Sequence, residues 1–329
     1  MNTSVRIGVL GTGYWGKNLL RNFAELNALS AAFDISDEAK RRTIDKYPGI
    51  KHCTDEKDLF TDPNIDAVAI ATPAATHARL ALMALEAGKH VFVEKPLALS
   101  VTEAESVVAK AEMSGLILMV GHLLLYHPAF DTMKKLVEDD AIGPLRYIYS
   151  NRLSLGKIRQ EENALWSFAP HDVSMILSLV GALPTEVMAT GGKYLQPEID
   201  DISLTCLGFA GGIKAHIFVS WLHPYKDHKM VVIGETGMLA FDDTRPDSEK
   251  LSLYRHVVDL TDGLPTINKA EGQLVPYDWI EPLRQECSTF IRAVANGTPP
   301  PSDGQEGIRV LRIIQSAQES ILAGKKISL

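Results

Sequence analysis

The stretch that decides the fold is Val5–Gly16, which reads VRIGVLGTGYWG. An apolar run predicts a buried strand, and the glycine-rich turn after it leads into a helical pattern. A strand that turns through G-x-G-x-x-G into a helix forms a seat for a pyrophosphate. Gly11 permits the tight turn, Gly13 lets the backbone approach the phosphates, and Gly16 lets the helix pack against the strand. The phosphates would face the unpaired N–H groups at the helix start.

A second apolar run, residues 29–33, ends at Asp34, which lies 18 residues past Gly16. A carboxylate at this place can accept hydrogen bonds from both adenosine ribose hydroxyls, and it repels a 2′-phosphate. No arginine follows it directly. The alternative is an ordinary strand-turn-helix with a surface aspartate. The spacing favours a dinucleotide site that prefers NAD over NADP.

Composition excludes several classes of protein. The 329 residues are 46% hydrophobic and 22% charged, and the net charge of −8 offers no basic stripe for nucleic acid. No apolar run is long enough to cross a membrane, and the first residues lead directly into the first strand, so we expect no signal peptide. The widely spaced Cys53, Cys206 and Cys287 argue against disulfides and structural zinc, and we expect no metal site. A cytoplasmic enzyme fits this profile.

Two domains are expected, 1–122 and 123–329. In the first, apolar runs alternate with helical patterns, which predicts an α/β fold with a doubly wound parallel sheet of the Rossmann type. The second contains several strand-like runs with short turns, which predicts an α+β domain with a large, mostly antiparallel open sheet. The helical patterns at 280–296 and 305–323 are candidates for packing back on the first domain. An open sheet face favours a homo-dimer or homo-tetramer.

Ligands of parallel sheets lie at the carboxyl ends of the strands. In the first domain this rule selects the glycine turn, the segment ATPAATH at 71–77 and the segment EKP at 94–96. The residues predicted to bind the cofactor are Gly11, Gly13, Tyr14, Trp15, Gly16, Asp34, Thr72, Pro73, His77, Glu94 and Lys95.

Lys95 is the first candidate for chemistry. It follows a strand and precedes Pro96, which holds it in an extended conformation and projects it into the crevice at the strand ends. An ammonium group near the nicotinamide can polarise a hydroxyl and stabilise the developing alkoxide. The alternative is a surface lysine that happens to follow a strand.

His171 is the second candidate. Pro170 suits the first position of a helix that runs to Val180, which would place His171 in the first turn. The positive end of the helix dipole would there favour a neutral imidazole, which is the form that a general base needs. The alternative is a structural histidine with local hydrogen bonds.

The order of GTGYWG, ATPAATH, EKP and a downstream histidine at a helix start resembles the Gfo/Idh/MocA family, which consists of two-domain sugar and polyol dehydrogenases. The resemblance implies that Lys95 and His171 are catalytic. Many members carry a carboxylate four residues before the histidine or three after it, where this chain has Ser167 and Ser174. Asp172 is the candidate substitute.

Three segments, 121–128, 150–159 and 162–172, resemble the branch of the family that oxidises C3 of UDP-N-acetylglucosamine or its uronic acid. Such enzymes form a 3-keto sugar that a pathway aminotransferase converts to a 2,3-diamino sugar of the kind used in lipid A and lipopolysaccharide. Arginines match phosphate geometry and could bind the diphosphate. The implied residues for the nucleotide-sugar substrate are Lys95, His122, Tyr126, Arg152, Arg159, Asn163, Trp166, His171 and Lys226.

The leading hypothesis is therefore NAD-dependent oxidation of the C3 hydroxyl of a UDP-sugar, with His171 taking the hydroxyl proton and Lys95 stabilising the alkoxide. The sequence does not decide which of the two is the immediate base. A UDP-N-acetylglucosaminuronate 3-dehydrogenase and a polyol or hexose dehydrogenase are the alternatives among enzymes. A sensor that binds the dinucleotide without turnover is the alternative outside them.

Overall fold

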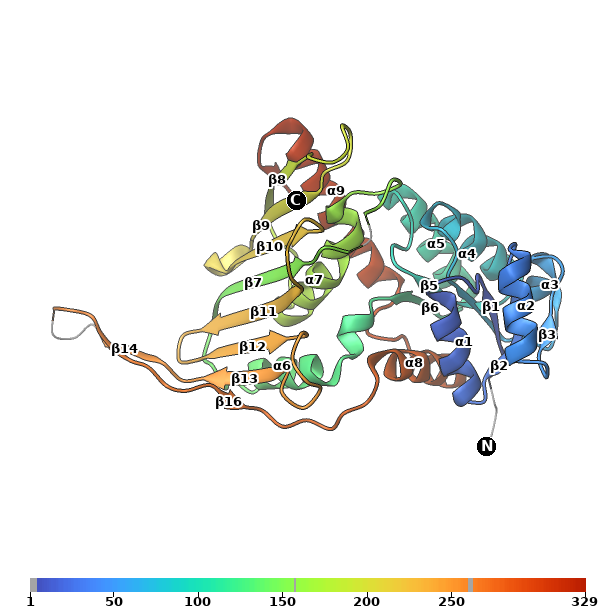
Figure 1. Ribbon diagram of the computed structural model, residues 1–329, viewed down its shortest axis with the longest axis horizontal. Helices are drawn as coiled ribbons and strands as arrows, with labels where there is room; N and C mark the ends of the chain where they lie inside the picture. The colour runs from blue at the N-terminus through green and yellow to red at the C-terminus, as the bar shows by residue number, and fades with distance from the viewer. Residues whose placement is uncertain (1–4, 157, 260–262) are drawn as a thin grey trace. The chain divides into compact units, whose positions relative to one another are not determined.

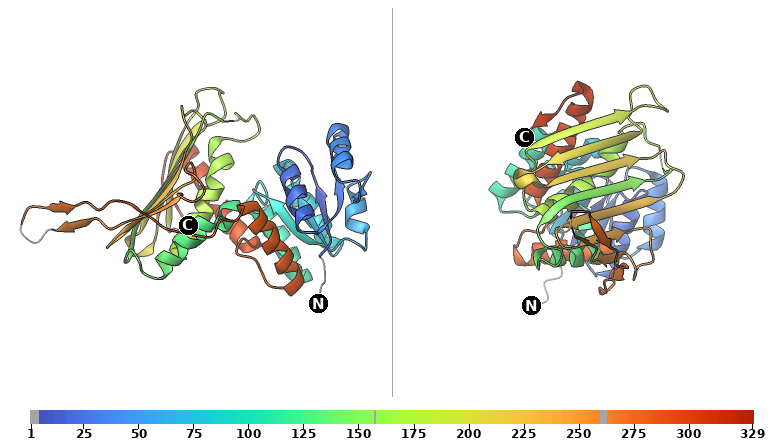
Figure 2. Two further views of the ribbon diagram at one scale, coloured as in Figure 1. Left: turned by 60° about the horizontal axis from the view of Figure 1, so that its bottom comes forward. Right: turned by 90° about the vertical axis from the view of Figure 1, so that its left-hand side faces the viewer.

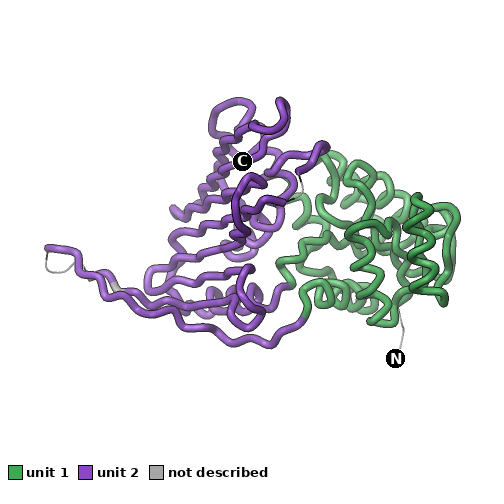
Figure 3. The backbone as a smooth tube through the Cα atoms, viewed as in Figure 1, with its two compact units in different colours: residues 1–126, 281–311 green, residues 127–280, 312–329 purple. Residues whose placement is uncertain are grey.

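The computed structural model describes residues 5–156, 158–259 and 263–329 (Figure 1). The chain forms two compact units, each built from two separate parts of the sequence (Figure 3). Unit 1 comprises Met1–Tyr126 and Glu281–Leu311, and unit 2 comprises His127–Ile280 and Arg312–Leu329. Across the described ranges, each helix is too short or too polar to cross a lipid bilayer.

Unit 1 contains a six-stranded sheet in which every pair of neighbours is parallel, in the order β3-β2-β1-β4-β5-β6. Its strands are β1 (Ile7–Leu10), β2 (Leu29–Phe33), β3 (Lys51–His52), β4 (Ala67–Ile70), β5 (His90–Glu94) and β6 (Leu118–Gly121). This is the doubly wound Rossmann order, and the direction of winding reverses between β1 and β4, where a ligand is expected. The predicted fold class is confirmed.

Helices follow the strands of unit 1, as the alternating pattern predicts, and two helices come from the C-terminal part of the chain. They are α1 (Gly16–Glu25), α2 (Asp37–Lys46), α3 (Lys57–Thr61), η1 (Ala74–Thr76), α4 (His77–Glu86), α5 (Val101–Ser114), η2 (Leu123–Tyr126), α8 (Pro282–Asn296) and the start of α9 (Gly304–Ala323). Capping residues fix where several of these helices begin and end. The side chains of Ser36 and Ser100 accept N–H groups at the starts of α2 and α5, and Gly115 ends α5 with a φ of 64°.

The core of unit 1 joins segments that are far apart in the sequence. Phe23 of α1, Phe92 of β5 and Phe290 of α8 are fully buried and meet edge to face, with ring centroids 5.7–6.5 Å apart. Such pairs add to the stabilisation that burial of the rings provides. Helix α8 is thus an integral part of the Rossmann unit, although more than 150 residues separate it from β6.

Unit 2 contains a nine-stranded sheet in the order β16-β13-β12-β11-β7-β10-β9-β8-β17. Only the β7–β10 pair is parallel among its described pairings. The strands are β7 (Leu145–Leu153), β8 (Glu186–Gly192), β9 (Ile202–Gly208), β10 (Lys214–Ser220), β11 (Asp227–Gly234), β12 (Met238–Asp242), β13 (Leu251–Tyr254), β16 (Gln273–Leu274) and β17 (Ile327–Ser328). The expected mostly antiparallel sheet is confirmed.

Helices α6 (Pro128–Glu138) and α7 (Ala164–Val180) pack on one face of this sheet (Figure 2). Strand residues alternate between that covered face and the opposite one. The opposite face exposes apolar side chains, including Met188 at 55% and Leu204 at 38%. A separate two-stranded ribbon, β14 (Val257–Asp259) with β15 (Thr266–Asn268), extends from the same unit (Figure 1).

Candidate active site

The glycine turn of unit 1 has the geometry that a pyrophosphate needs. Gly11 has a φ of +89°, and a Cβ there would lie 2.7 Å from the carbonyl oxygen of Ala71. A Cβ on Gly16 would lie 1.9 Å from the carbonyl oxygen of Gly11, so the helix and the turn can approach only without a side chain. A Cβ on Gly13 would meet no atom within 4 Å. The backbone at Gly13 therefore faces open space, which fits the close approach of a phosphate.

The aromatic residues of the turn differ in their surroundings. Tyr14 is 87% exposed, and the ammonium of Lys17 lies 5.2 Å from its ring centroid. The indole N–H of Trp15 instead donates a hydrogen bond to Glu94 at the end of β5. Helix α1 begins after Trp15 without a side-chain cap, so its first N–H groups suit an anionic ligand.

Asp34 lies at the carboxyl end of β2, in the wall of a cavity of about 160 Å³. Its Oδ2 accepts the backbone N–H of Thr12 at 2.6 Å, and its Oδ1 accepts the N–H of Ser36 at 2.8 Å. These bonds hold the carboxylate beside the glycine turn, where a ribose would lie. The lining also includes Phe33 and Cys53, which supply an apolar surface suited to an adenine ring.

The loop after β4 is braced by His77, which is 1% exposed. One ring nitrogen lies 2.7 Å from the carbonyl oxygen of Pro96 and the other lies 2.8 Å from that of Thr72. His77 therefore joins the two loops at the ends of β4 and β5. Pro73, beside Thr72, leads into η1. Sequence reasoning assigned His77 to the cofactor, whereas its ring contacts position the loop that carries Lys95.

Glu94 ends β5, and Lys95 follows it directly. Burial raises the pKa of Glu94 to about 7, against the opposing effects of the Trp15 indole and the Lys95 charge and N–H. Glu286 of α8 is fully buried, and burial together with the nearby Glu94 raises its pKa well above the usual range. Neither oxygen of Glu286 has a hydrogen-bond partner in the described chain. Sequence reasoning missed this buried carboxyl, because α8 carries no motif.

His122 and Tyr126, which the resemblance assigned to the substrate, are buried in unit 1. His122 Nδ1 lies 2.5 Å from a carboxylate oxygen of Glu306, and the Tyr126 hydroxyl lies 2.7 Å from the Ser302 hydroxyl. Burial raises the pKa of Tyr126. Both contacts connect the end of β6 to the segment that begins α9, and no sequence pattern indicated Ser302 or Glu306.

The helix that carries His171 begins earlier than predicted. Asn163 caps α7 by accepting the N–H of Trp166 at 3.1 Å, and Pro170 lies inside the helix rather than at its first position. A good cap outweighed the break that a proline favours. The prediction that His171 lies in the first turn is therefore wrong, and the helix dipole gives no reason for its imidazole to be neutral.

Asp172, the candidate carboxylate for His171, forms its hydrogen bonds with Arg152 and Ser150 of β7. It is 1% exposed, and its two oxygens accept hydrogen bonds from Arg152 at 2.7 and 3.0 Å and from the Ser150 hydroxyl at 2.5 Å. Burial opposes the charge of Arg152, but the Asp172 carboxylate outweighs it and raises the pKa of the guanidinium. This bidentate pair joins α7 to β7. The sequence predicted Arg152 as a phosphate ligand and did not reveal its carboxylate partner.

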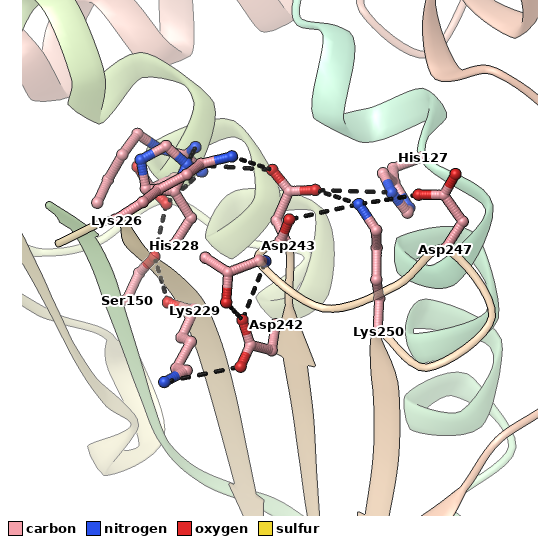
Figure 4. A network of polar contacts seen from close by, with 12 residues as sticks. His127, Ser150, Lys226, His228, Lys229, Asp242, Asp243, Asp247 and Lys250 are labelled. Atoms are coloured by element: carbon pink, nitrogen blue, oxygen red, sulfur yellow. Dashed lines mark hydrogen bonds and ion pairs between the residues drawn. The ribbon is translucent and has the colours of Figure 1, made fainter. Parts of the chain in front are cut away.

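Figure 4 shows a second charged network in unit 2, centred on Asp243. Lys250 donates to Asp243 at 2.8 Å, and the ammonium of Lys226 lies 3.9 Å from it. His127 and His228 lie 3.9 and 4.0 Å from the same carboxylate. Burial lowers the pKa of each histidine to about 4, so both are neutral near pH 7. Lys226, predicted as a phosphate ligand, thus lies beside a carboxylate.

The other predicted substrate residues of unit 2 also have protein contacts. Arg159 Nε lies 3.0 Å from Glu162, and its side chain is 38% exposed. The Asn163 side-chain amide donates to Gln318 at 2.6 Å while its oxygen caps α7, and Trp166 is partly buried in the first turn. In the part of the chain that the structure describes, no group of three or more acidic, histidine or cysteine residues could hold a metal ion.

Comparison with known families identifies the chain. Residues 5–122 match the model of an oxidoreductase family with an NAD-binding Rossmann fold, and residues 130–240 match the GFO/IDH/MocA C-terminal domain. The chain belongs to the Gfo/Idh/MocA family. As a Gfo/Idh/MocA oxidoreductase it uses a nicotinamide cofactor, and the glycine turn, the uncapped start of α1 and the cavity at Asp34 fit NAD.

Relatives within the family act on different substrates. The chain is 26% identical to UDP-N-acetylglucosamine 3-dehydrogenase of Acidithiobacillus ferrooxidans, over 93% of this chain and 94% of that protein. It is 27% identical to myo-inositol 2-dehydrogenase of Thermotoga maritima, over 99% and 98%. A solved structure of the Acidithiobacillus enzyme superposes with a TM-score of 0.84 at 25% identity and covers 97% of both chains. The family assignment is therefore secure across the chain, and identities at this level do not select one substrate.

Proposed function

We propose that this oxidoreductase oxidises the C3 hydroxyl of a UDP-sugar, UDP-N-acetylglucosamine in the first instance, with NAD as the hydride acceptor. Two observations support the proposal together: the likeness to UDP-N-acetylglucosamine 3-dehydrogenase over 93% of the chain in sequence and 97% in structure, and the partly exposed cations Arg159 and Lys226, which suit a diphosphate. The 3-keto product is the substrate class that an aminotransferase needs to form a 2,3-diamino sugar, so such an enzyme is the proposed pathway partner.

Two residues are proposed to handle the hydroxyl. His171 takes the proton as the C–O bond becomes a carbonyl, and the Lys95 ammonium stabilises the alkoxide that develops. The cofactor, when bound, supplies the acceptor for the hydride from C3. Glu94 influences Lys95 directly, because its carboxylate accepts the Lys95 backbone N–H and interacts with the Lys95 charge. The proton leaves through one of these side chains to solvent, which balances the two-electron oxidation.

The charged side chains of unit 2 are proposed to bind the diphosphate in unequal ways. Arg159 and Lys226 have side chains that are 38% and 53% exposed and have only one described ion pair each. Arg152 donates to Asp172 through Nε and Nη2, and its Nη1 lies 3.4 Å from His228 Nδ1, so it is proposed to reach a phosphate only through the remaining N–H groups of Nη1 and Nη2. Asn163 and Trp166 are proposed to contact the sugar. His122 and Tyr126 are buried and bonded to Glu306 and Ser302, so they are proposed to act on the sugar only by positioning the end of β6.

A polyol dehydrogenase is the second candidate, and a specific observation favours it. Arg152, Arg159 and Lys226 each lie within 4 Å of a carboxylate, so the predicted phosphate ligands are largely neutralised within unit 2. An uncharged substrate such as inositol would need no excess of positive charge. The myo-inositol 2-dehydrogenase relative is as similar in sequence as the UDP-sugar enzyme.

One experiment separates these functions. NADH formation is followed by absorbance with UDP-N-acetylglucosamine, its uronic acid, myo-inositol and glucose as substrates. Turnover of the first supports the proposal, and turnover of the uronic acid alone moves the assignment to a uronate 3-dehydrogenase. Turnover of inositol or glucose alone supports the polyol alternative. Binding of NAD without turnover of any substrate would favour the sensor.

We also propose that the protein works in the cytoplasm as a homo-dimer or homo-tetramer. The apolar side chains on the uncovered sheet face, including Met188 and Leu204, support pairing of that face with a second copy. Light scattering at micromolar concentration tests the assembly, and a strictly monomeric species would contradict it.

A further inference from the structure

The uncovered face of the sheet in unit 2 is hollowed over β11, β12 and β13. One row of directly opposite residues crosses these strands and β7, and it consists of Tyr149, Val231, Ala240 and Ser252. Directly opposite residues point to the same face of a sheet. Ala240 alternates with buried residues of β12, so the row lies on the face that α6 and α7 do not cover. Its small central side chains, flanked by Tyr149 and Tyr254, leave a cavity of about 470 Å³, which we call the groove.

The β14–β15 ribbon has one apolar face and one polar face. Val258 and Ile267 lie directly opposite each other, are 57% and 62% exposed, and form what we call the apolar pair. Thr266 and Asn268, on either side of Ile267, point to the opposite face of the ribbon. In the described ranges the ribbon is separate from the nine-stranded sheet, and a two-stranded ribbon by itself is at best marginally stable in water. A surface that covers the apolar pair would therefore stabilise it.

The base of the ribbon is anchored. A Cβ on Gly272 would lie 2.6 Å from the Tyr254 ring, so the returning segment passes directly against that side chain. The Ala270 N–H donates to His256 Nδ1 at 3.0 Å and joins the two sides of the base. From there the ribbon extends on the side of the sheet opposite α6 and α7 (Figure 2). Among the described residues that line the groove, neither member of the apolar pair is present, so the ribbon does not cover the groove of its own chain.

A second copy of this chain suits both surfaces. The ribbon extends from the same face that carries the groove, so a copy paired with that face would receive the ribbon and present its own in return. Two-fold symmetry then makes the same contact twice, as in the commonest soluble dimers. The same face exposes further apolar side chains, Met188 and Leu204 among them, that a single copy leaves in water. The groove, the ribbon and these side chains all lie on the side of the sheet that a second copy would cover.

We propose that two copies of this chain exchange their β14–β15 ribbons, with the apolar pair of one copy packed in the groove between Tyr149 and Tyr254 of the partner subunit. The inference rests on the proposed pairing of the uncovered sheet faces and names the segment that strengthens it. The apolar pair leaves water only when the two copies associate, so the ribbon contributes to association rather than to the folding of one chain.

The first test compares two variants of β15 by light scattering over a dilution series. Ile267→Asp places a charge in the contact and is expected to raise the dissociation constant of the dimer by at least about tenfold, the scale of one buried aliphatic side chain. Asn268→Asp adds the same charge to the opposite face of the ribbon and is expected to change that constant by about twofold at most. Circular dichroism checks that both variants fold.

A cross-linking test shows whether the contact joins two chains. All chains carry Cys206→Ser, because Cys206 is an exposed cysteine. Chains with Ile267→Cys and chains with Ala240→Cys are co-expressed and oxidised with copper phenanthroline. A disulfide between them, seen without reductant as a species of twice the chain mass, is expected in the mixture and not in either variant alone. Since position 240 lies on the floor of the groove, this disulfide needs the two Cα atoms within about 7 Å of each other.

The outcomes separate the ribbon exchange from the assembly. A wild type that is monomeric at micromolar concentration overturns both. An oligomer in which Ile267→Asp and Asn268→Asp act equally, or in which the mixed chains give no disulfide, overturns the exchange and leaves the pairing of the sheet faces standing. A chain with both Ile267→Cys and Ala240→Cys that closes a disulfide within itself places the ribbon on its own groove and also overturns the exchange.

Discussion

The glycine turn of unit 1 and the Arg152–Asp172 pair of unit 2 differ in the interactions on which they depend. The turn depends on backbone conformation within a short stretch, where Gly11 and Gly16 avoid contacts that any Cβ would make. The pair depends on two side chains 20 residues apart, which β7 and α7 bring within 2.7 Å. The first kind of feature can be identified from sequence spacing alone. The second depends on which elements pack together.

The largest expected effect concerns chemistry rather than folding. Lys95→Ala and His171→Ala should each lower kcat by roughly two to four orders of magnitude, the usual worth of a positioned acid or base. Binding of NAD, measured by titration, should weaken little, because neither side chain is assigned to the pyrophosphate or the adenosine and Lys95 is expected only near the nicotinamide. Lys57→Ala, on the exposed start of α3, serves as the matched control and should leave kcat unchanged. Near-normal turnover in either variant would remove that residue from the mechanism.

The buried pair of unit 2 should give the next largest effect. Asp172→Ala leaves the Arg152 guanidinium buried without its carboxylate and should lower the free energy of unfolding by about 3–5 kcal/mol. Replacing Arg152 with methionine and Asp172 with leucine should lower the free energy of unfolding far less, because no buried charge is then left unpaired. Denaturant unfolding of the single and double variants measures the difference. If the double variant is as unstable as the single one, the ion pair is not the cause.

The glycine turn can be tested by separating folding from binding. Gly16→Ala forces a Cβ against the Gly11 carbonyl oxygen and should lower the free energy of unfolding by about 1–3 kcal/mol. Gly13→Ala meets no protein atom, so it should leave stability near normal and weaken NAD binding. Thermal unfolding without cofactor and titration with NAD distinguish these outcomes. If Gly13→Ala lowers the free energy of unfolding as much as Gly16→Ala does, then Gly13 is needed for folding and not for the approach of a ligand.

The substrate proposal predicts a smaller effect on KM. Arg159→Ala should raise KM for UDP-N-acetylglucosamine by about tenfold with little change in kcat, because a contact remote from the reacting carbon binds ground and transition states alike. Arg159→Lys should restore part of the loss. A free polyol should show no such dependence. An unchanged KM for the best substrate would remove Arg159 from the diphosphate site.

The smallest effect is the pH dependence of stability. Burial raises the pKa of Glu94 to about 7 and that of Glu286 well above its usual range. An acid whose pKa is raised on folding stabilises the folded state fully below its unfolded pKa and loses that contribution as pH rises through the folded value. The free energy of unfolding should therefore fall from about pH 5 to above pH 7. Glu286→Gln should make the free energy of unfolding fall less steeply at the alkaline end. A pH profile of stability that Glu286→Gln leaves unchanged would contradict the raised pKa of Glu286.

Most of the fold could be predicted from the sequence. The alternation of apolar runs and helical patterns located β1, β2, β4, β5 and β6 and the helices between them, since each run is buried in a parallel sheet. The shortest strands, β3, β16 and β17, were not predicted. A strand of two residues is too short to show an alternation of apolar and polar residues, and it forms only because a neighbouring strand pairs with it. The start of α7 was missed because Pro170 outweighed the weaker signal of Asn163 as a cap.

The sequence by itself determined the dinucleotide turn, the family and the positions of Asp34 and Lys95 just after their strands, because these features depend on local spacing and backbone geometry. Only the tertiary structure decided which charges are neutralised. It paired Arg152 with Asp172, placed Lys226 beside Asp243, buried Glu286 near Glu94 and brought Arg42 to the turn at Thr12. The reason is that electrostatic partners are chosen by distance in space, and packing of distant elements sets that distance.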